Sequence, residues 1–81
     1  MVINNFLKKF LGIIDWSIEE VGEWISDLGF EKMKDCFIEN YISGKELVDL
    51  QNDELKDDLG VTALGARKAI LREIQILKNK N

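Results

Sequence analysis

The chain has 81 residues, of which 46% are hydrophobic and 32% are charged, and its formal net charge is -4. This length accommodates one small domain with a single core. Histidine is absent and Cys36 is the lone cysteine, which excludes an intramolecular disulfide and a zinc site built from nitrogen and sulfur ligands. We therefore expect no metal site and no cofactor. A lone cysteine also suits a reducing compartment, so we expect an intracellular, cytoplasmic location.

Helical patterns run through the whole chain. Proline is absent, and no segment alternates apolar and polar residues in the way a strand does, so we predict an all-α fold. The apolar runs are far shorter than the roughly 20 residues that span a bilayer. Charge is distributed unevenly: acids outnumber bases 14 to 4 from Asp15 to Asp58, whereas bases outnumber acids 5 to 1 from Val61 to Asn81.

The first predicted element is an amphipathic helix over residues 1–14. Its apolar face has helical spacing and consists of Ile3, Phe6, Leu7, Phe10, Leu11 and Ile14. A helix this short is unstable alone in water, so the face needs a cover. Three interpretations stay open: packing on its own domain or on a copy, binding at a membrane surface with Lys8 and Lys9 beside the apolar stripe, or a frayed tail.

The next helix begins after Ser17, which is the predicted N-cap of a capping box with Glu20. The residues expected on its buried stripe are Val21, Trp24, Ile25 and Leu28. Gly29 then ends the helix in a left-handed cap. This pattern predicts a helix that begins after Ser17 and ends at Gly29, with Trp24 in the core.

Three shorter segments follow the first core helix. A helix is predicted from about Glu31 to Asn40, with an inward face made of Met33, Cys36, Phe37 and Tyr41. Ser43 and Glu46 predict a second capping box, which opens a very short helix carrying Leu47, Val48 and Leu50. Asn52 is the predicted cap of the next short helix, whose buried residues are Leu55 and Leu59.

The longest helix is predicted over residues 63–78, with Thr62 as its cap and a glycine-punctuated turn before it. Its core stripe consists of Ile70, Leu71, Ile74 and Leu77. Arg67 and Lys68 lie in its first turn, where the partial positive charge of the helix end disfavours each cation by about 0.3 to 1 kcal/mol. Exceptions to a local rule of this kind tend to mark functional positions.

This order of helices resembles the sterile alpha motif (SAM) domain over about residues 16–78. The resemblance is carried by Trp16-Ser17, Val21, Trp24-Ile25, Leu28-Gly29-Phe30, Phe37, Ile42-Ser43-Gly44, Leu47, Leu50, residues 54–61, residues 64–68, Ile70-Leu71, Ile74 and Leu77. The chain departs from the usual pattern at Met33, Ser43 and Ala66, where an aromatic residue, an Asp and a His are common. The resemblance implies a five-helix SAM-like bundle, with residues 1–15 as an N-terminal extension and residues 79–81 as a polar tail.

The resemblance also implies a protein interaction module in signalling or scaffolding, which pairs with other SAM domains, its own copies or those of another protein. In such pairs an end-helix surface on one domain meets a mid-loop surface on its neighbour, and the chain of contacts can build an oligomer. The matching end-helix residues are Leu64, Gly65, Ala66, Arg67, Lys68 and Arg72. The acidic mid-loop candidates are Glu39, Glu46, Asp49, Asp53, Glu54, Asp57 and Asp58.

Asp57 and Asp58 are the most informative acids, because they lie in the last turn of a short helix, the unfavourable end for negative charge. Two other functions stay open: lipid association through residues 1–14, and RNA hairpin binding, which the acidic body disfavours. The sequence has no histidine, no phosphate-binding glycine loop and no nucleophile paired with a base. We therefore expect no catalytic residues and no enzymatic activity.

Overall fold

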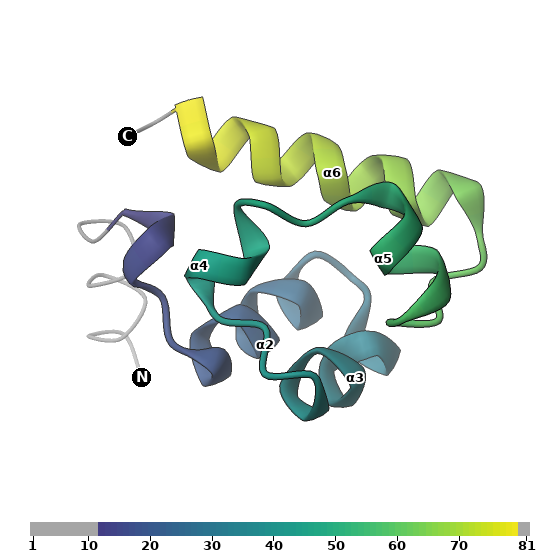
Figure 1. The fold of residues 1–81 in the computed structure, drawn as a ribbon, viewed down its shortest axis with the longest axis horizontal. Coiled ribbons are helices and arrows are strands. Elements are labelled where there is room, and N and C mark those ends of the chain that lie inside the picture. The colour runs from purple at the N-terminus through teal and green to yellow at the C-terminus, as the bar shows by residue number, and fades with distance from the viewer. Residues whose placement is uncertain (1–11, 80–81) are drawn as a thin grey trace.

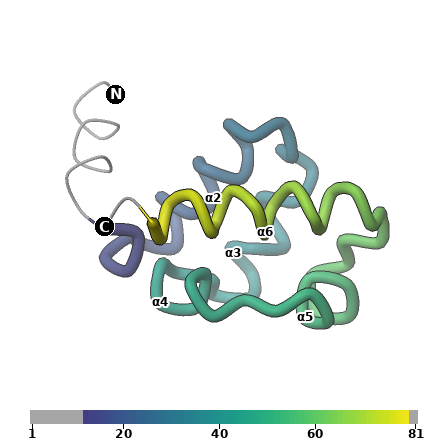
Figure 2. Tube along the Cα trace, turned by 90° about the horizontal axis from the view of Figure 1, so that it is seen from above, coloured from purple at the N-terminus to yellow at the C-terminus, as the bar shows by residue number. Residues whose placement is uncertain are grey.

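The computed structural model describes residues 12–79, and every regular element in that range is helical. The elements are η1 (Ile13–Asp15), α2 (Ile18–Asp27), η2 (Glu31–Met33), α3 (Lys34–Glu39), α4 (Gly44–Leu47), α5 (Asn52–Asp57) and α6 (Leu64–Asn79). The long helix α6 runs along the domain, and the short helices gather against it (Figure 1). The view from above shows α6 crossing them along the longest dimension (Figure 2). The predicted all-α fold with a long final helix is confirmed.

One continuous cluster of buried apolar side chains holds the helices together. Its members are Ile13, Trp16, Val21, Trp24, Ile25, Phe37, Ile42, Leu47, Leu55, Leu59, Val61, Ile70 and Ile74. Trp16 and Trp24 meet edge to face, with ring centroids 6.2 Å apart. Trp24 therefore lies in the core, as predicted. Within residues 12–79, none of the helices has the length and apolar character that crossing a membrane requires.

The two ends of α2 and the start of α4 follow the chemistry read from the sequence. At the start of α2 the Ser17 N–H donates to Glu20 Oε1 across 2.8 Å, and the Glu20 N–H donates to Ser17 Oγ across 3.1 Å, which completes the capping box. A second capping box joins Ser43 and Glu46 at α4. After α2 the chain turns at Gly29, whose φ of 100° belongs to the left-handed region that favours glycine.

Several predicted features of the short helices are wrong. The helix expected over residues 31–40 is divided into η2 and α3, and Tyr41 is 73% exposed instead of facing inward. The N-cap of α5 is Gln51, and Asn52 is the first helical residue. The long helix α6, by contrast, starts at Leu64, in agreement with the start expected at about residue 63. Tyr41 lies beyond the end of α3 and has a φ of 56°, so the helical spacing that predicted its inward position does not apply to it.

The segment that precedes α2 is docked on α4 by a glycine. The Gly44 N–H donates to the Trp16 carbonyl across 2.9 Å, and a Cβ at position 44 would lie 1.8 Å from the Ile13 carbonyl oxygen. Ile13 is buried there, whereas Ile14 is 52% exposed. Ile14 is the described member of the predicted N-terminal apolar face; the other members, Ile3, Phe6, Leu7, Phe10 and Leu11, lie outside the described residues.

Candidate functional site

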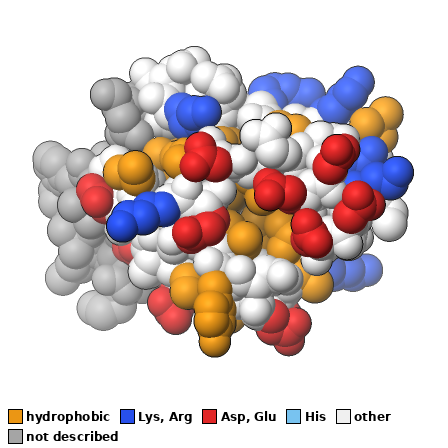
Figure 3. Space-filling model, viewed as in Figure 1, with side chains coloured by type: hydrophobic (Ala, Val, Ile, Leu, Met, Phe, Trp, Pro, Cys, Tyr) orange, Lys and Arg blue, Asp and Glu red, His pale blue; other side chains and the backbone are white. Residues whose placement is uncertain are grey.

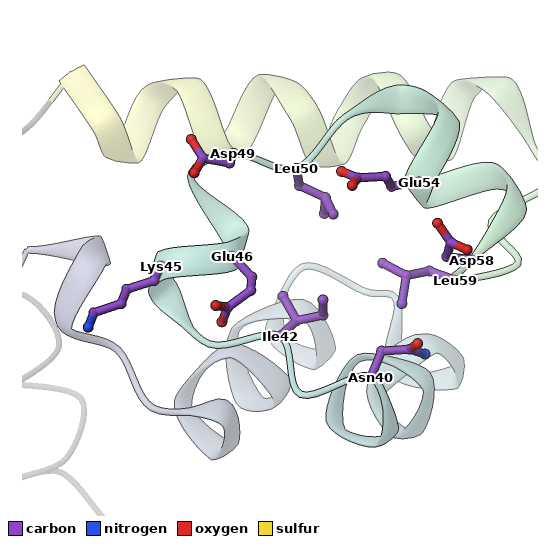
Figure 4. Close-up of a pocket in the computed structure, with 9 residues that line it drawn as sticks. All are labelled: Asn40, Ile42, Lys45, Glu46, Asp49, Leu50, Glu54, Asp58 and Leu59. Carbon is purple, nitrogen blue, oxygen red and sulfur yellow. The ribbon is translucent and has the colours of Figure 1, made fainter.

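An open hollow lies between the end of α3 and the helices α4 and α5, with a volume of about 350 Å³. Its lining residues are Asn40, Ile42, Lys45, Glu46, Asp49, Leu50, Glu54, Asp58 and Leu59. Figure 4 shows the side chains of Ile42, Leu50 and Leu59 pointing toward the middle of the hollow. These three side chains give the hollow an apolar floor.

The rim of the hollow is acidic. Its carboxylates belong to Glu46, Asp49, Glu54 and Asp58, whereas the ammonium group of Lys45 points away from the centre (Figure 4). The space-filling view shows acidic side chains placed around an apolar patch on this face (Figure 3). Within residues 12–79 no three acidic or other ligating side chains are close enough to hold a metal ion. The negative charge is therefore spread around an apolar centre, which suits a cationic partner with apolar surface.

Two of the rim carboxylates are held in place by the helix starts. The N–H of Ser43 donates to Glu46 Oε1 across 3.0 Å, and the N–H of Gln51 donates to Glu54 Oε1 across 2.9 Å. The hydrogen bond from the Ser43 hydroxyl, followed by the bond from its N–H, lowers the pKa of Glu46 below its ordinary value. Capping thus orients part of the rim and favours the ionised form of the Glu46 carboxyl.

The hollow brings together some of the acids predicted for the mid-loop surface and leaves others outside it. Those on the rim are Glu46, Asp49, Glu54 and Asp58; those outside are Glu39, Asp53 and Asp57, all of them exposed. On α5 the division follows helical geometry, because residues four apart share a face. Glu54 and Asp58 therefore line the hollow together, and Asp53 and Asp57 lie on the neighbouring face.

The predicted end-helix surface has an exposed part at the start of α6. Leu64 is 54% exposed, and Lys68 and Arg72, one turn apart, are also exposed. Gly65 is exposed as well, and a Cβ there would meet no atom within 4 Å. Ala66 is half-buried and packs against the core. The free surface at this end is thus one large apolar side chain beside two cations, and Figure 3 shows basic side chains gathered toward this end.

Arg67 does not belong to that exposed surface, although the resemblance placed it among the end-helix residues. Its side chain is only 7% exposed, and its Nε donates to Asn52 Oδ1 across 2.9 Å. Its Nη1 donates to the carbonyl oxygens of Val61 and Thr62 across 2.8 and 2.9 Å. The cation that seemed misplaced at a helix start is therefore satisfied by backbone carbonyls and fastens α6 to the start of α5.

The two surfaces do not neutralise each other within one chain. Among residues 12–79, no ion pair joins Asp57 or Asp58 to Lys68 or Arg72. The acidic rim and the basic helix start are therefore both available to a second molecule.

Sequence reasoning missed the uncharged residues of the hollow. Leu50 and Leu59 were expected only as core residues, and Asn40 was expected only as a helix terminator. Leu50 is half-buried, and Ile42 and Leu59 are buried yet line the hollow. The available signal was a set of apolar residues, each close in sequence to an acid, in the short loops between helices.

Comparison with known proteins places the described fold in context. Residues 15–78 match the SAM domain (sterile alpha motif) family. The chain is 39% identical over 74 residues to the human WD repeat, SAM and U-box domain-containing protein 1. The aligned residues cover 91% of this chain and 15% of that protein. It is 39% identical over 72 residues to protein pob1 of Schizosaccharomyces pombe, covering 89% of this chain and 8% of that protein.

Another relative corrects the expectation that no enzymatic activity is involved. The chain is 38% identical over 63 residues to a Drosophila melanogaster protein named NAD(+) hydrolase sarm1. The aligned residues cover 78% of this chain and 5% of that protein. Domains of this kind therefore occur in proteins named as enzymes. The missing catalytic motifs were an insufficient basis for the prediction, because this chain spans 15% or less of the lengths of these relatives.

Proposed function

Because the chain belongs to the SAM domain family, whose members generally act as protein interaction modules, we propose that it pairs head to tail with another SAM domain. The exposed start of α6 on one molecule enters the acidic hollow of the next. In the simplest form the neighbour is a second copy of this chain, and a SAM domain of another protein with the same basic start is the heterotypic form.

The observation that carries this proposal is the match between the two surfaces. The hollow has an apolar floor inside an acidic rim, and the start of α6 presents Leu64 beside Lys68 and Arg72. Complementary charge mainly sets orientation and the rate of encounter, whereas affinity needs a desolvated apolar contact. Leu64 supplies that contact when it packs on the floor. The acidic rim also argues against RNA as the ligand of the hollow, since it repels phosphate.

The arrangement of the surfaces determines the kind of assembly. The hollow is formed by the end of α3 with α4 and α5, and the basic surface is formed by α6, so the two patches are different. Each molecule that uses both patches contacts two neighbours. Such a contact closes into a ring or continues as an open helix, depending on the rotation between neighbours.

Sedimentation velocity across protein and salt concentration tests the proposal. We expect the wild-type chain to form species larger than a monomer at high protein concentration, and these to dissociate as salt rises. Lys68→Glu should abolish them, because it places a carboxylate against the acidic rim. Lys32→Glu is the matched control, since Lys32 is an exposed residue of η2 with the same charge change. A wild type that stays monomeric at low salt, or equal loss in both variants, would contradict homotypic pairing.

A further inference from the structure

Three helices of this domain end at a residue with left-handed backbone geometry. After α2 that residue is Gly29, with a φ of 100°, and after α5 it is Gly60, with a φ of 71°. After α3 it is Tyr41, with a φ of 56°. Glycine adopts this geometry without a steric penalty, whereas a bulky side chain is strained in it. Tyrosine is thus a costly choice at a position where the same chain twice uses glycine.

Packing does not account for the tyrosine. Its side chain is 73% exposed, the largest exposure among the exposed large hydrophobic residues of the described chain. Within residues 12–79 its hydroxyl has no hydrogen-bond partner. An exposed ring in this position adds little to the core, so the strain is not offset by burial or by a hydrogen bond.

The position of the ring relates it to the acidic hollow. Tyr41 lies between Asn40 and Ile42, and both of these neighbours line the hollow. In Figure 4 they form the side of the hollow that faces Asp49, Leu50 and Glu54. Tyr41 itself does not line the hollow, so its exposed ring lies outside it, next in sequence to two residues of a site whose rim is acidic and whose floor is apolar.

We infer that Tyr41 extends the contact surface beyond the edge of the hollow, and that its ring packs on a cationic side chain of the α6 start that enters from a second copy. This inference rests on the proposed head-to-tail pairing and adds a residue outside the acidic rim. Lysine and arginine bind aromatic rings through both their charge and their aliphatic stems. Tyrosine combines large contact area with little conformational freedom, which is why it is frequent among residues that dominate interface affinity.

Two variant chains, each of which retains only one of the two interaction surfaces, isolate this contact. A chain with Lys68→Glu keeps its hollow and loses its basic start, and a chain with Asp58→Lys keeps its basic start and loses its hollow. These two chains can form one contact only, and isothermal titration calorimetry measures its Kd. Tyr41→Gly is then placed first on the chain that supplies the hollow and, as the matched control, on the chain that supplies α6.

We expect Tyr41→Gly on the hollow-supplying chain to raise Kd by about three- to fivefold, the loss typical of an exposed cation–π contact. On the α6-supplying chain it should change Kd by less than twofold. Tyr41→Phe on the hollow-supplying chain should keep most of the affinity, because it retains the ring. In both chains Tyr41→Gly should raise Tm, since it relieves the strained φ. Weaker binding together with a more stable fold distinguishes a binding role from a structural one.

Each other result overturns the inference in an identifiable way. If Tyr41→Gly on the hollow-supplying chain leaves Kd within twofold of the parent pair, Tyr41 is not a contact and the head-to-tail proposal stands. Equal weakening on both chains shows an effect on folding and removes the binding role. If the parent pair does not bind at all, the proposed pairing fails and the role of Tyr41 fails with it.

Discussion

Arg67 Nε donates a hydrogen bond to Asn52 Oδ1 across 2.9 Å, joining residues fifteen positions apart. The same guanidinium donates to the carbonyls of Val61 and Thr62, so one side chain spans the start of α5, the turn and the start of α6. The α5 residues of the acidic rim and the basic helix start are therefore fixed relative to each other by a buried cation. The angle between successive molecules in a head-to-tail assembly depends on that geometry.

Replacement of Arg67 should destabilise the fold strongly. Arg67→Met keeps the apolar stem but leaves the buried Val61 carbonyl, the part-buried Thr62 carbonyl and the Asn52 side chain without their donor, for which we expect a loss of about 2 to 4 kcal/mol. Urea denaturation measures the loss. Lys68→Met, at the exposed neighbouring position, should change the free energy of unfolding by no more than about 0.5 kcal/mol. Similar effects at both positions would contradict the structural role of Arg67.

Gly44→Ala should also destabilise the domain, for a steric reason. The added Cβ would lie 1.8 Å from the Ile13 carbonyl oxygen, so the segment before α2 has to move off α4. Overpacking of this kind costs about 1 to 3 kcal/mol. We expect a lower urea midpoint and a changed fluorescence of Trp16, which is buried beside this segment. An unchanged midpoint would show that the segment is not docked in this way.

The parts of the fold that follow from local chemistry were predictable from the sequence. Helical spacing identified Ile70 and Ile74 as core residues of α6, and the Ser17 and Glu20 side chains predicted a capping box that the structure contains. These features depend on residues one turn apart. Their geometry is therefore nearly independent of the rest of the molecule.

The parts that depend on how distant segments meet were not predictable. The hydrogen bonds of Arg67 were not predictable, because they require the carbonyls of Val61 and Thr62 and the side chain of Asn52 to converge on it. The exposure of Tyr41 was not predictable either, because α3 ends before it and its left-handed φ departs from the helical spacing. The candidate site was anticipated through its charges, whereas the apolar floor emerges only when separate helices are assembled.

Gly65→Ala is expected to act in opposite directions on stability and on pairing. A Cβ at this position of α6 meets no atom within 4 Å, so alanine should stabilise the helix by about 0.5 kcal/mol. The same methyl group adds bulk to the end-helix surface and should weaken self-association in sedimentation velocity. Unaltered self-association of the more stable variant would show that Gly65 is not in close contact with the neighbour.

The stability of the fold should carry a pH dependence that traces to Glu46. The Ser43 hydroxyl, and then the Ser43 N–H, lower the pKa of Glu46 from its ordinary value of 4.5 in the folded state. A lowered pKa contributes stability above the ordinary value, and that contribution is lost as the pH falls through the folded pKa. Wild type should therefore exceed Glu46→Gln in urea midpoint at pH 7, and the difference should shrink below pH 4.5. A constant difference would contradict this assignment.

The most direct test of head-to-tail pairing is sedimentation velocity of the Lys68→Glu and Asp58→Lys chains, each alone and then mixed in equal amounts. Each variant keeps one of the two surfaces, so each should be monomeric alone and the mixture should form a complex of one chain of each kind. Asp57→Lys in place of Asp58→Lys is the control, because Asp57 does not line the hollow; this variant should still self-associate. A mixture that sediments as two monomers, or an Asp57→Lys chain that behaves as Asp58→Lys does, would contradict pairing through the acidic hollow.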